Sequence, residues 1–298
     1  MKTMNKALSL FLAVSSCYLV AAEPAKSKAV HQPTPESKAS FIRDYDLNKD
    51  GTVTAEEFAQ VRQQRFSSGD ENQDGVLQLD EYVNEYANRL DKRLHAEREG
   101  QIKQTHTRIG ALDKDKSGSI SLAEYQDSGE RAFNFIDTNK DGVISKADPA
   151  PKRPAGEKPE PVRARPALVM PTTHSVAGML AMYDKDGDGK VTKEEYLAER
   201  TAAFKRTDLD GNGDLSADEY LNEFVDRLDR QIAKTRQSQL KQAEVRFAAL
   251  DKDKNQQISA AEYQASGDRM FARWDTNADK AVSMKEALPA IEPSQRAD

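Results

Sequence analysis

The chain of 298 residues repeats its own sequence at one fixed offset. Three pairs of matching segments show the offset: 111–116 and 249–254, 123–126 and 261–264, and 128–129 and 266–267. No residue has been gained or lost between these segments, so the chain is an internal duplication. A repeat constrains the fold more than any local pattern does, because each copy must form the same structural unit.

The apolar residues of each copy are spaced as in a helix. Tyr82, Tyr86, Leu90 and Leu94 follow one another at intervals of four, and the second copy repeats the series at 220, 224, 228 and 232. This spacing places them on one helical face, where core packing is their expected role. No alternating run is long enough for a full strand. The sequence therefore predicts an all-α fold, and a composition with 32% charged and 7% aromatic residues suits small helical units.

Residues 1–22 form a predicted signal peptide. Lys2 and Lys6 precede an uncharged apolar run from Ala7 to Val20, and Val20 and Ala22 occupy the small-residue positions of a cleavage site. The run is shorter than the roughly 20 residues that a membrane span needs, which disfavours an anchor. We therefore expect a periplasmic or secreted protein.

A lipid anchor at Cys17 is the alternative, because residues 14–17 (Val-Ser-Ser-Cys) resemble a permissive lipoprotein box. The apolar run continues beyond this cysteine, so we favour cleavage after Ala22. The mature chain then has no cysteine, no disulfide and no transmembrane span. Its formal net charge becomes −8, because the signal removes two lysines from a chain with a charge of −6.

Proline-bearing segments bound the two copies. Residues 23–40 form a predicted disordered lead-in, and 150–176 form a linker. Seven of the chain's twelve prolines lie between 149 and 171, and we favour an extended spacer over a docking motif for this segment. The predicted domains are 41–149 and 177–290, followed by a tail at 291–298.

Acidic twelve-residue segments carry the chemistry. In the first, from Asp46 to Glu57, oxygen-bearing side chains stand at positions 1, 3, 5 and 9, Gly51 is at position 6, and Val53 is at position 8. A hard divalent cation needs six to eight oxygens, and a short loop supplies them when alternate side chains turn inward around a sharp bend. Glycine tolerates the bend, the position-7 carbonyl adds an oxygen, and the final glutamate can bind through both of its oxygens. We expect Val53 to pair with the equivalent residue of a neighbouring loop.

The pattern occurs eight times, four times in each copy. For positions 1, 3, 5, 7 (the carbonyl) and 12, the candidate ligands are Asp46, Asn48, Asp50, Thr52 and Glu57; Asp70, Asn72, Asp74, Val76 and Glu81; Asp113, Asp115, Ser117, Ser119 and Glu124; Asp137, Asn139, Asp141, Val143 and Asp148; Asp184, Asp186, Asp188, Lys190 and Glu195; Asp208, Asp210, Asn212, Asp214 and Glu219; Asp251, Asp253, Asn255, Gln257 and Glu262; and Asp275, Asn277, Asp279, Ala281 and Glu286. The sequence thus predicts up to eight Ca²⁺ ions.

Three loops are irregular. The fourth ends in Asp148, which is one carbon shorter than glutamate, and Pro149 stops any exit helix. The seventh has Gln256 and the eighth Lys280 in place of the position-6 glycine. We expect weaker binding in these three loops.

The eight loops resemble those of the EF-hand superfamily, over residues 41–149 and 177–290, and the exported character is similar to that of bacterial calsymin-like proteins. The resemblance implies that hands pair through short β contacts: the first loop with the second, the third with the fourth, and likewise in the second copy. It also implies that calcium repositions helices.

The loop spacing is unusual for the superfamily. Loops start at 46, 70, 113 and 137 in the first copy and at 184, 208, 251 and 275 in the second, so one helix must leave the first loop and enter the next. The longer step between the second and third loops suggests an extended helix, broken near Gly100. Close spacing also resembles lanmodulin-type lanthanide binders, but those loops carry proline at position 2 and aspartate at position 9. Here position 9 holds a hydroxyl or an amide, which favours calcium and leaves lanthanide binding as the alternative.

The predicted function is therefore calcium binding. The protein would act as a sensor with a calcium-dependent protein partner, as a buffer, or as a calcium-stabilised structural protein. Only four histidines are present, none in a catalytic motif, so we expect no enzymatic activity. Nucleic-acid binding is disfavoured for an exported acidic chain.

Overall fold

The computed structural model describes residues 32–151 and 160–290. Residues Pro33–Pro289 form one compact unit. The predicted signal peptide, the alternative lipid site at Cys17, residues 23–31 of the lead-in and the tail at 291–298 lie outside the described residues. No helix in the described ranges is both long and apolar enough to cross a membrane.

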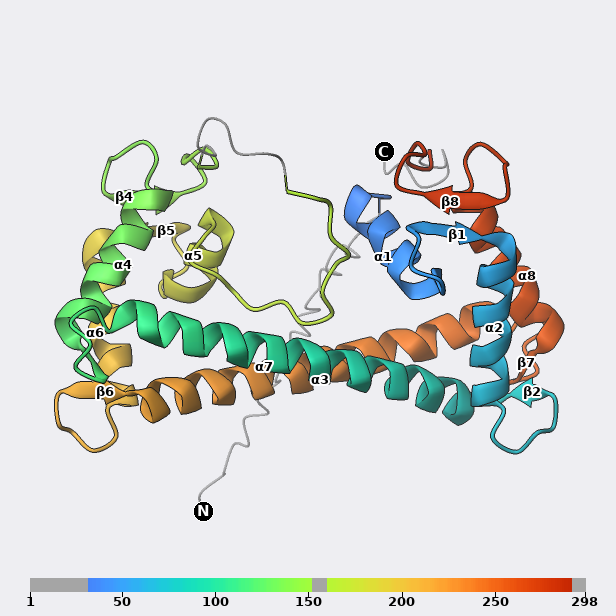
Figure 1. Ribbon diagram of the computed structural model, residues 1–298, viewed down its shortest axis with the longest axis horizontal. Helices are drawn as coiled ribbons and strands as arrows, with labels where there is room; N and C mark the ends of the chain where they lie inside the picture. Colours follow the sequence, from blue (N-terminus) through green and yellow to red (C-terminus); the bar gives the residue numbers. More distant parts are fainter. Residues whose placement is uncertain (1–31, 152–159, 291–298) are drawn as a thin grey trace, which may run out of the picture. The chain divides into compact units, whose positions relative to one another are not determined.

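The unit consists of helices joined by loops with very short strands (Figure 1). The helices are α1 (Pro35–Tyr45), α2 (Ala55–Gly69), α3 (Leu79–Leu112), α4 (Leu122–Ile136), α5 (Val176–Tyr183), α6 (Lys193–Thr207), α7 (Ala217–Leu250) and α8 (Ala260–Trp274). The strands are β1 (Thr52–Thr54), β2 (Val76–Leu77), β3 (Ser119–Ser121), β4 (Val143–Ser145), β5 (Lys190–Thr192), β6 (Asp214–Ser216), β7 (Ile258–Ser259) and β8 (Ala281–Ser283). The predicted helical class is confirmed.

Each acidic loop sets the ends of its helices. In the first loop, the amide of Asp46 still donates to the Ile42 carbonyl and closes α1. The Thr54 hydroxyl accepts from the Glu57 amide at 3.1 Å, and the Glu57 carboxylate accepts from the Thr54 amide at 3.0 Å. This reciprocal pair is a capping box, which satisfies two amides that a helix start leaves free. The same residues that form the candidate metal loop therefore begin α2.

The helices that connect consecutive loops agree only in part with those predicted from the loop spacing. Helix α2 leaves the first loop and enters the second, as the short step requires. Helix α3 is continuous from Leu79 to Leu112, so the expected break near Gly100 is wrong. A mid-helix glycine costs only about 1 kcal/mol relative to alanine, and the packing of α3 along α7 outweighs that cost.

The loops pair across the two copies, so the predicted pairing within each copy is wrong. Strand β1 pairs with β8, β2 with β7, β3 with β6, and β4 with β5, all antiparallel. The first loop thus faces the eighth, and the second faces the seventh. The position-8 residues do meet as expected: Val53 lies opposite Val282 and both are fully buried.

The cores are shared between the copies for the same reason. One cluster joins Phe41 and Phe58 of the first copy to Val282, Phe271 and Trp274 of the second. Helix α2 lies beside α8, and α4 lies beside α6 (Figure 1). Loops 1, 2, 7 and 8 therefore form one group of four hands, and loops 3 to 6 form the other. The ranges 41–149 and 177–290 mark the copies in sequence, and their use as domain boundaries stays a prediction.

Helices α3 and α7 link the two groups of hands. They lie side by side and run in opposite directions (Figure 1). The Arg98 Nε donates to Asp229 at 2.7 Å, and the Arg236 Nε donates to Asp91 at 2.8 Å. In the register of the repeat, position 98 corresponds to 236 and position 91 to 229, so the contact obeys the internal duplication.

The described part of the linker packs against this helix pair. Residues 160–175 form no helix or strand, yet Leu168 is only 2% exposed and joins the cluster of Leu90, Leu94, Phe224 and Leu228. The prediction of a simple spacer is therefore wrong for this part of the segment.

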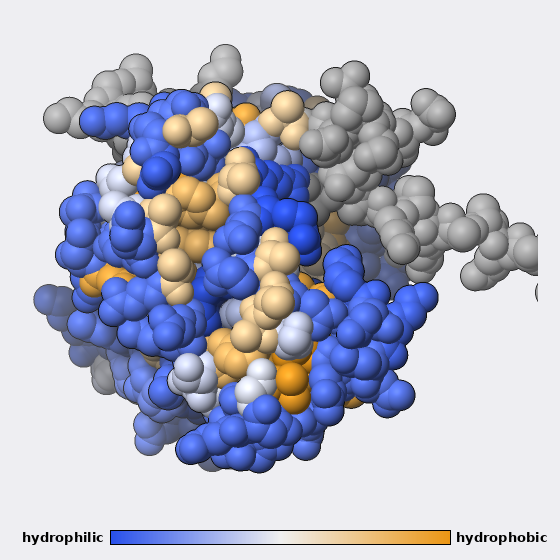
Figure 2. Space-filling view, turned by 90° about the vertical axis from the view of Figure 1, so that its right-hand side faces the viewer, coloured by the Kyte–Doolittle hydropathy of each residue, from blue (hydrophilic) through white to orange (hydrophobic). Residues whose placement is uncertain are grey.

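The surface matches the hydrophilic composition, with a mean hydropathy of −0.80. Figure 2 shows the side that carries α2 and α8: hydrophilic side chains cover most of it, and apolar residues reach the surface in narrow strips. Among the described residues, large apolar side chains that are exposed are scattered over several elements.

Candidate calcium sites

The carboxylate at position 1 organises each loop. In all eight loops its Oδ2 accepts a hydrogen bond from the backbone amide of position 6, over 2.9–3.1 Å. This bond pulls the sharp bend back over the start of the loop. The first and sixth positions are thereby fixed relative to each other.

The carboxylate at position 12 closes each loop from the other end. In all eight loops it accepts from the backbone amide of position 9 at 2.7–3.0 Å. Asp148 does this as the glutamates do, although Pro149 follows and β4 does not lead directly into a helix. The shorter side chain therefore reaches its expected place in loop 4.

The side chain at position 5 also accepts a bond from within its loop. The amide of position 7 donates to the position-5 side-chain oxygen at 2.8–3.5 Å in every loop. Local amides thus orient the oxygens at positions 1, 5 and 12. The predicted side-chain ligands at positions 1, 3, 5 and 12 come from one short segment in each case, and their assignment as calcium ligands stays a prediction.

Carboxylates gather closely in four of the loops. Three carboxylate oxygens lie within 4.8 Å of one another in loops 3, 5, 6 and 7. The groups are Asp113, Asp115 and Glu124; Asp184, Asp186 and Asp188; Asp208, Asp210 and Glu219; and Asp251, Asp253 and Glu262. Loop 7 belongs to this set although its bend lacks glycine. Like charges at this distance repel one another, so a divalent cation among them would be favoured.

Hydrogen bonds keep three of these carboxylates ionised. The backbone amide and hydroxyl of Ser121 lower the pKa of Glu124 to about 2. Ser216 does the same for Glu219, whose pKa is about 2, and Ser259 for Glu262, whose pKa is also about 2. A carboxylate must be deprotonated to bind a metal ion, so these groups are ready as ligands throughout the physiological pH range.

Loop 4 contains an oxygen that lacks a partner. Asp137 is 7% exposed, and its Oδ1 is buried without a hydrogen bond from any described residue. Its Oδ2 accepts from the Gly142 amide at 3.0 Å. A buried carboxylate oxygen without a partner is unfavourable unless a cation compensates it. The all-oxygen donor set fits a hard cation such as Ca²⁺.

The backbone is left-handed at two places in every loop, of which the sequence pattern indicated only position 6. Position 4 also has positive φ in all eight loops, at Lys49, Gln73, Lys116, Lys140, Gly187, Gly211, Lys254 and Ala278. Loops 5 and 6 have glycine at both places, whereas loops 7 and 8 have it at neither. In the sequence, the only sign of this second left-handed position is the glycine at position 4 of loops 5 and 6, Gly187 and Gly211. The pattern of ligand positions does not include position 4.

Comparison with known proteins agrees with this geometry. A family model described as EF hand matches residues 38–61, 108–127, 130–148, 176–198 and 201–225, which contain loops 1, 3, 4, 5 and 6. The irregular loop 4 is thus among the matched segments. The family matches, together with the loop geometry, support the EF-hand superfamily as the class of this protein.

Two sea-urchin proteins are similar to the chain. Calcium-binding protein LPS1-beta of Lytechinus pictus is 34% identical over 119 residues, which cover 37% of this chain and 47% of that protein. Calcium-binding protein LPS1-alpha of the same organism is 27% identical over 252 residues, covering 76% of this chain and 74% of that protein. Calcium binding through EF-hands is the function that these relatives support. The finer resemblance to bacterial calsymin-like proteins has no counterpart in these matches.

Proposed function

We propose that the protein is an exported calcium-responsive modulator that binds Ca²⁺ in eight loops coupled as four pairs between the two copies. The observation that carries the proposal is the buried, unpartnered Oδ1 of Asp137 in loop 4, within a set of oxygen ligands. Loop 4 was expected to be weak, and a buried carboxylate there is best explained by a cation that binds it. Export rests on the sequence of the predicted signal peptide alone.

Calcium fits the ligand sets better than a lanthanide. Most loops offer three carboxylates at ligand positions and a neutral hydroxyl at position 9. Fewer charges give looser binding, in the range of about 10⁻⁷–10⁻⁵ M for sensors to 10⁻⁴–10⁻³ M for extracellular modules. Lanthanide binding remains the alternative, which competition between the two ions would decide. EF-hand proteins are typically not enzymes, and we propose no catalytic role.

The pairing favours a modulator over independent buffering sites. Val191 of loop 5 lies opposite Ile144 of loop 4, and the Lys193 amide donates to the Gly142 carbonyl at 3.1 Å. A change in one loop is therefore transmitted directly to a loop of the other copy. Since α3 and α7 each contribute to both groups of hands, a change in helix position in one group reaches the other.

Calcium titration of a variant in loop 5 tests the coupling. Glu195→Gln removes the position-12 charge, and we expect calcium affinity to fall at loop 5 by at least tenfold and at its partner, loop 4, by a smaller factor. The amide signals of Gly189 and Gly142 report the two loops, because each amide donates to the position-1 carboxylate of its own loop. The amide signal of Gly75 in loop 2 serves as a reference. It should change at the same calcium concentration in Glu195→Gln as in the unaltered chain.

Glu194→Gln is the matched control, since it makes the same chemical change at the exposed position 11 of the same loop. It should leave all three signals unchanged. A chain that takes up no calcium at millimolar supply would refute the proposal, and an unaltered Gly142 response in Glu195→Gln would refute the coupling. A hydrophobic dye separates a sensor, which binds more dye with calcium, from a buffer, which binds less.

A further inference from the structure

The segment 160–171, here called the strap, is anchored in the groove between α3 and α7. The groove is defined by Leu90 and Leu94 of α3 and Phe224 and Leu228 of α7. Leu168 of the strap is 2% exposed within it, and Ala167 and Met170 pack beside it. The neighbouring Val169 points away and is 62% exposed. Leu168 is thus the buried apolar anchor of the strap.

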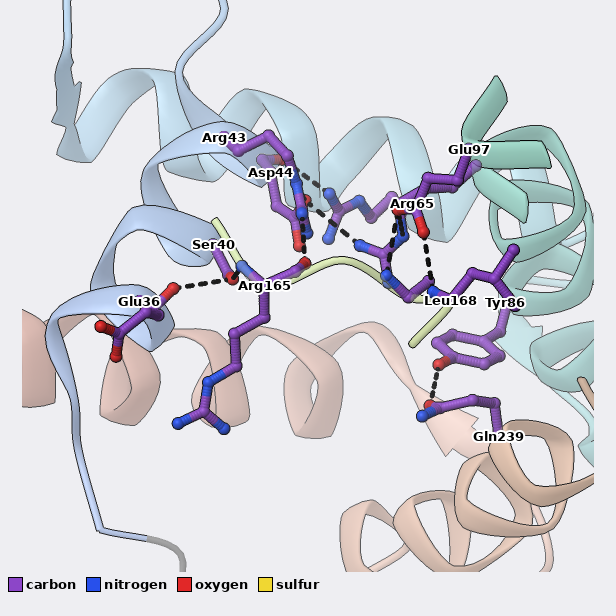
Figure 3. Close-up of polar contacts among 12 residues, drawn as sticks. Glu36, Ser40, Arg43, Asp44, Arg65, Tyr86, Glu97, Arg165, Leu168 and Gln239 are labelled. Atoms are coloured by element: carbon purple, nitrogen blue, oxygen red, sulfur yellow. Dashed lines mark hydrogen bonds and ion pairs between the residues drawn. The ribbon is translucent and has the colours of Figure 1, made fainter. Parts of the chain in front are cut away.

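The groove also recognises the backbone of the strap. The amides of Ala167 and Leu168 donate to the two carboxylate oxygens of Glu97, at 3.0 and 2.7 Å (Figure 3). An acceptor at this position selects an extended chain with two consecutive free amides. Glu97 lies on α3 beside the groove, and hydrogen bonds to a charged acceptor are stronger than those between neutral groups.

The arginine end of the strap contacts α1. The Arg165 amide donates to the Ser40 hydroxyl at 2.9 Å, and its guanidinium donates to Thr34 at 2.9 Å. The Arg165 carbonyl accepts from Arg43 at 2.9 Å. Figure 3 shows Arg165 beside Ser40 and Arg43, and Leu168 beside Glu97 further along the strap. The strap is therefore bound at its arginine and at its leucine, three residues apart.

The composition of the strap suits a preorganised ligand. Pro161, Pro166 and Pro171 restrict the backbone to extended conformations, and the described residues 160–170 contain no helix or strand. An extended, proline-bearing peptide loses little conformational freedom when it binds. The remaining side chains provide a basic residue and apolar anchors.

We propose that the α3–α7 groove, together with the adjoining face of α1, is a binding site for an extended peptide that carries arginine and leucine three residues apart, and that the strap occupies this site as an internal competitor. A partner peptide of the same chemistry binds when the strap leaves. The inference does not depend on calcium binding, because every contact that carries it lies outside the acidic loops.

Release of the strap tests the proposal in the full chain. Leu168→Ser removes the anchor but leaves every groove residue in place. A fluorescent synthetic peptide of residues 160–171 should bind this variant at least tenfold more tightly than it binds the unaltered chain, as measured by anisotropy with calcium and with chelator. In the Leu168→Ser chain, a second substitution, Glu97→Gln, should weaken peptide binding, because its amide nitrogen cannot accept a hydrogen bond.

Val169→Ser is the matched control, because it changes an exposed neighbour of the anchor; it should bind the peptide no better than the unaltered chain does. Hydrogen exchange of the unaltered chain gives a second measurement that needs no variant: the amides of Ala167 and Leu168 should exchange at least tenfold more slowly than in the free peptide. Equal peptide binding by the unaltered and Leu168→Ser chains, or unprotected amides at 167 and 168, would overturn the proposal.

Discussion

At the scale of single residues, the loops differ in which residue adopts the left-handed backbone at position 6. Gln256 in loop 7 has φ of 68°, and Lys280 in loop 8 has φ of 67°, where six loops have glycine. Side chains with a Cβ adopt this conformation at a cost of roughly 1–2 kcal/mol per residue. The bend is nevertheless kept, because the amide at this position must reach the first aspartate. The amide of Gln256 donates to Asp251 at 2.9 Å.

Gln256→Gly should therefore strengthen calcium binding in loop 7. Removal of about 1 kcal/mol of backbone strain corresponds to about a fivefold gain in affinity, which a calcium titration followed at the amide of residue 256 would measure. Gln257→Gly is the matched control: its φ is not positive, and its carbonyl, the candidate ligand, is retained. An equal gain in both variants would contradict the role of the bend.

Buried arginines fix the helices that carry paired loops, at the scale of the elements. Arg200 of α6 lies over the ring of Tyr125 on α4, 3.8 Å from its centroid, and donates to the Tyr125 carbonyl. Arg62 of α2 makes the same contacts with Tyr263 on α8, at 3.5 Å. Gly129 and Gly267 lie beneath these arginines, which explains a glycine inside each helix.

Gly129→Ala should lower the free energy of unfolding of the calcium-free chain by about 1–3 kcal/mol, the usual cost of overpacking. An added Cβ would overlap Nε of Arg200 and push the guanidinium off Tyr125. Gly100→Ala is the control, since no atom lies within 4 Å of its added Cβ and α3 is helical there. It should raise the free energy of unfolding by about 0.5–1 kcal/mol in chemical denaturation. Similar losses in both variants would show that the arginine contact contributes nothing.

The duplication acts at the scale of the whole molecule through reciprocal contacts. The Arg98–Asp229 and Arg236–Asp91 pairs, the two arginine–tyrosine contacts and the four strand pairs all join one copy to the other. Each pair of facing position-8 residues also lies in an apolar cluster that contains side chains from both copies. The exposed ion pairs contribute little by themselves, so shared apolar burial is what holds the copies together.

After cleavage of the linker, the two halves of the chain should therefore remain associated. With a protease site inserted between Glu157 and Lys158, the two halves should elute together from a size-exclusion column in calcium after cleavage. Complete separation of folded halves would instead indicate two independent domains. Denaturing electrophoresis of the same fractions verifies that the cut is complete.

Much of each candidate site could be predicted because its chemistry is local. The ligands at positions 1 to 12, the caps of the helices and the position-8 residue all belong to one twelve-residue segment, so their spacing in sequence is their spacing in space. Loop 4 shows the limit of such reasoning. The short Asp148 predicts a weak site, and the buried Oδ1 of Asp137, on which our proposal of a cation in loop 4 rests, is not evident from the spacing of the loop residues.

By itself, then, the sequence determined the loops, the helices between them and the duplication. Only the tertiary structure decided which loops pair, because strands of two or three residues with valine, isoleucine or leucine at position 8 fit one another equally well in any combination. Packing of α3 on α7, of the arginines on their tyrosines and of Leu168 in the groove selects one combination. These contacts join residues that are far apart in the chain, so they cannot be predicted from a local sequence pattern.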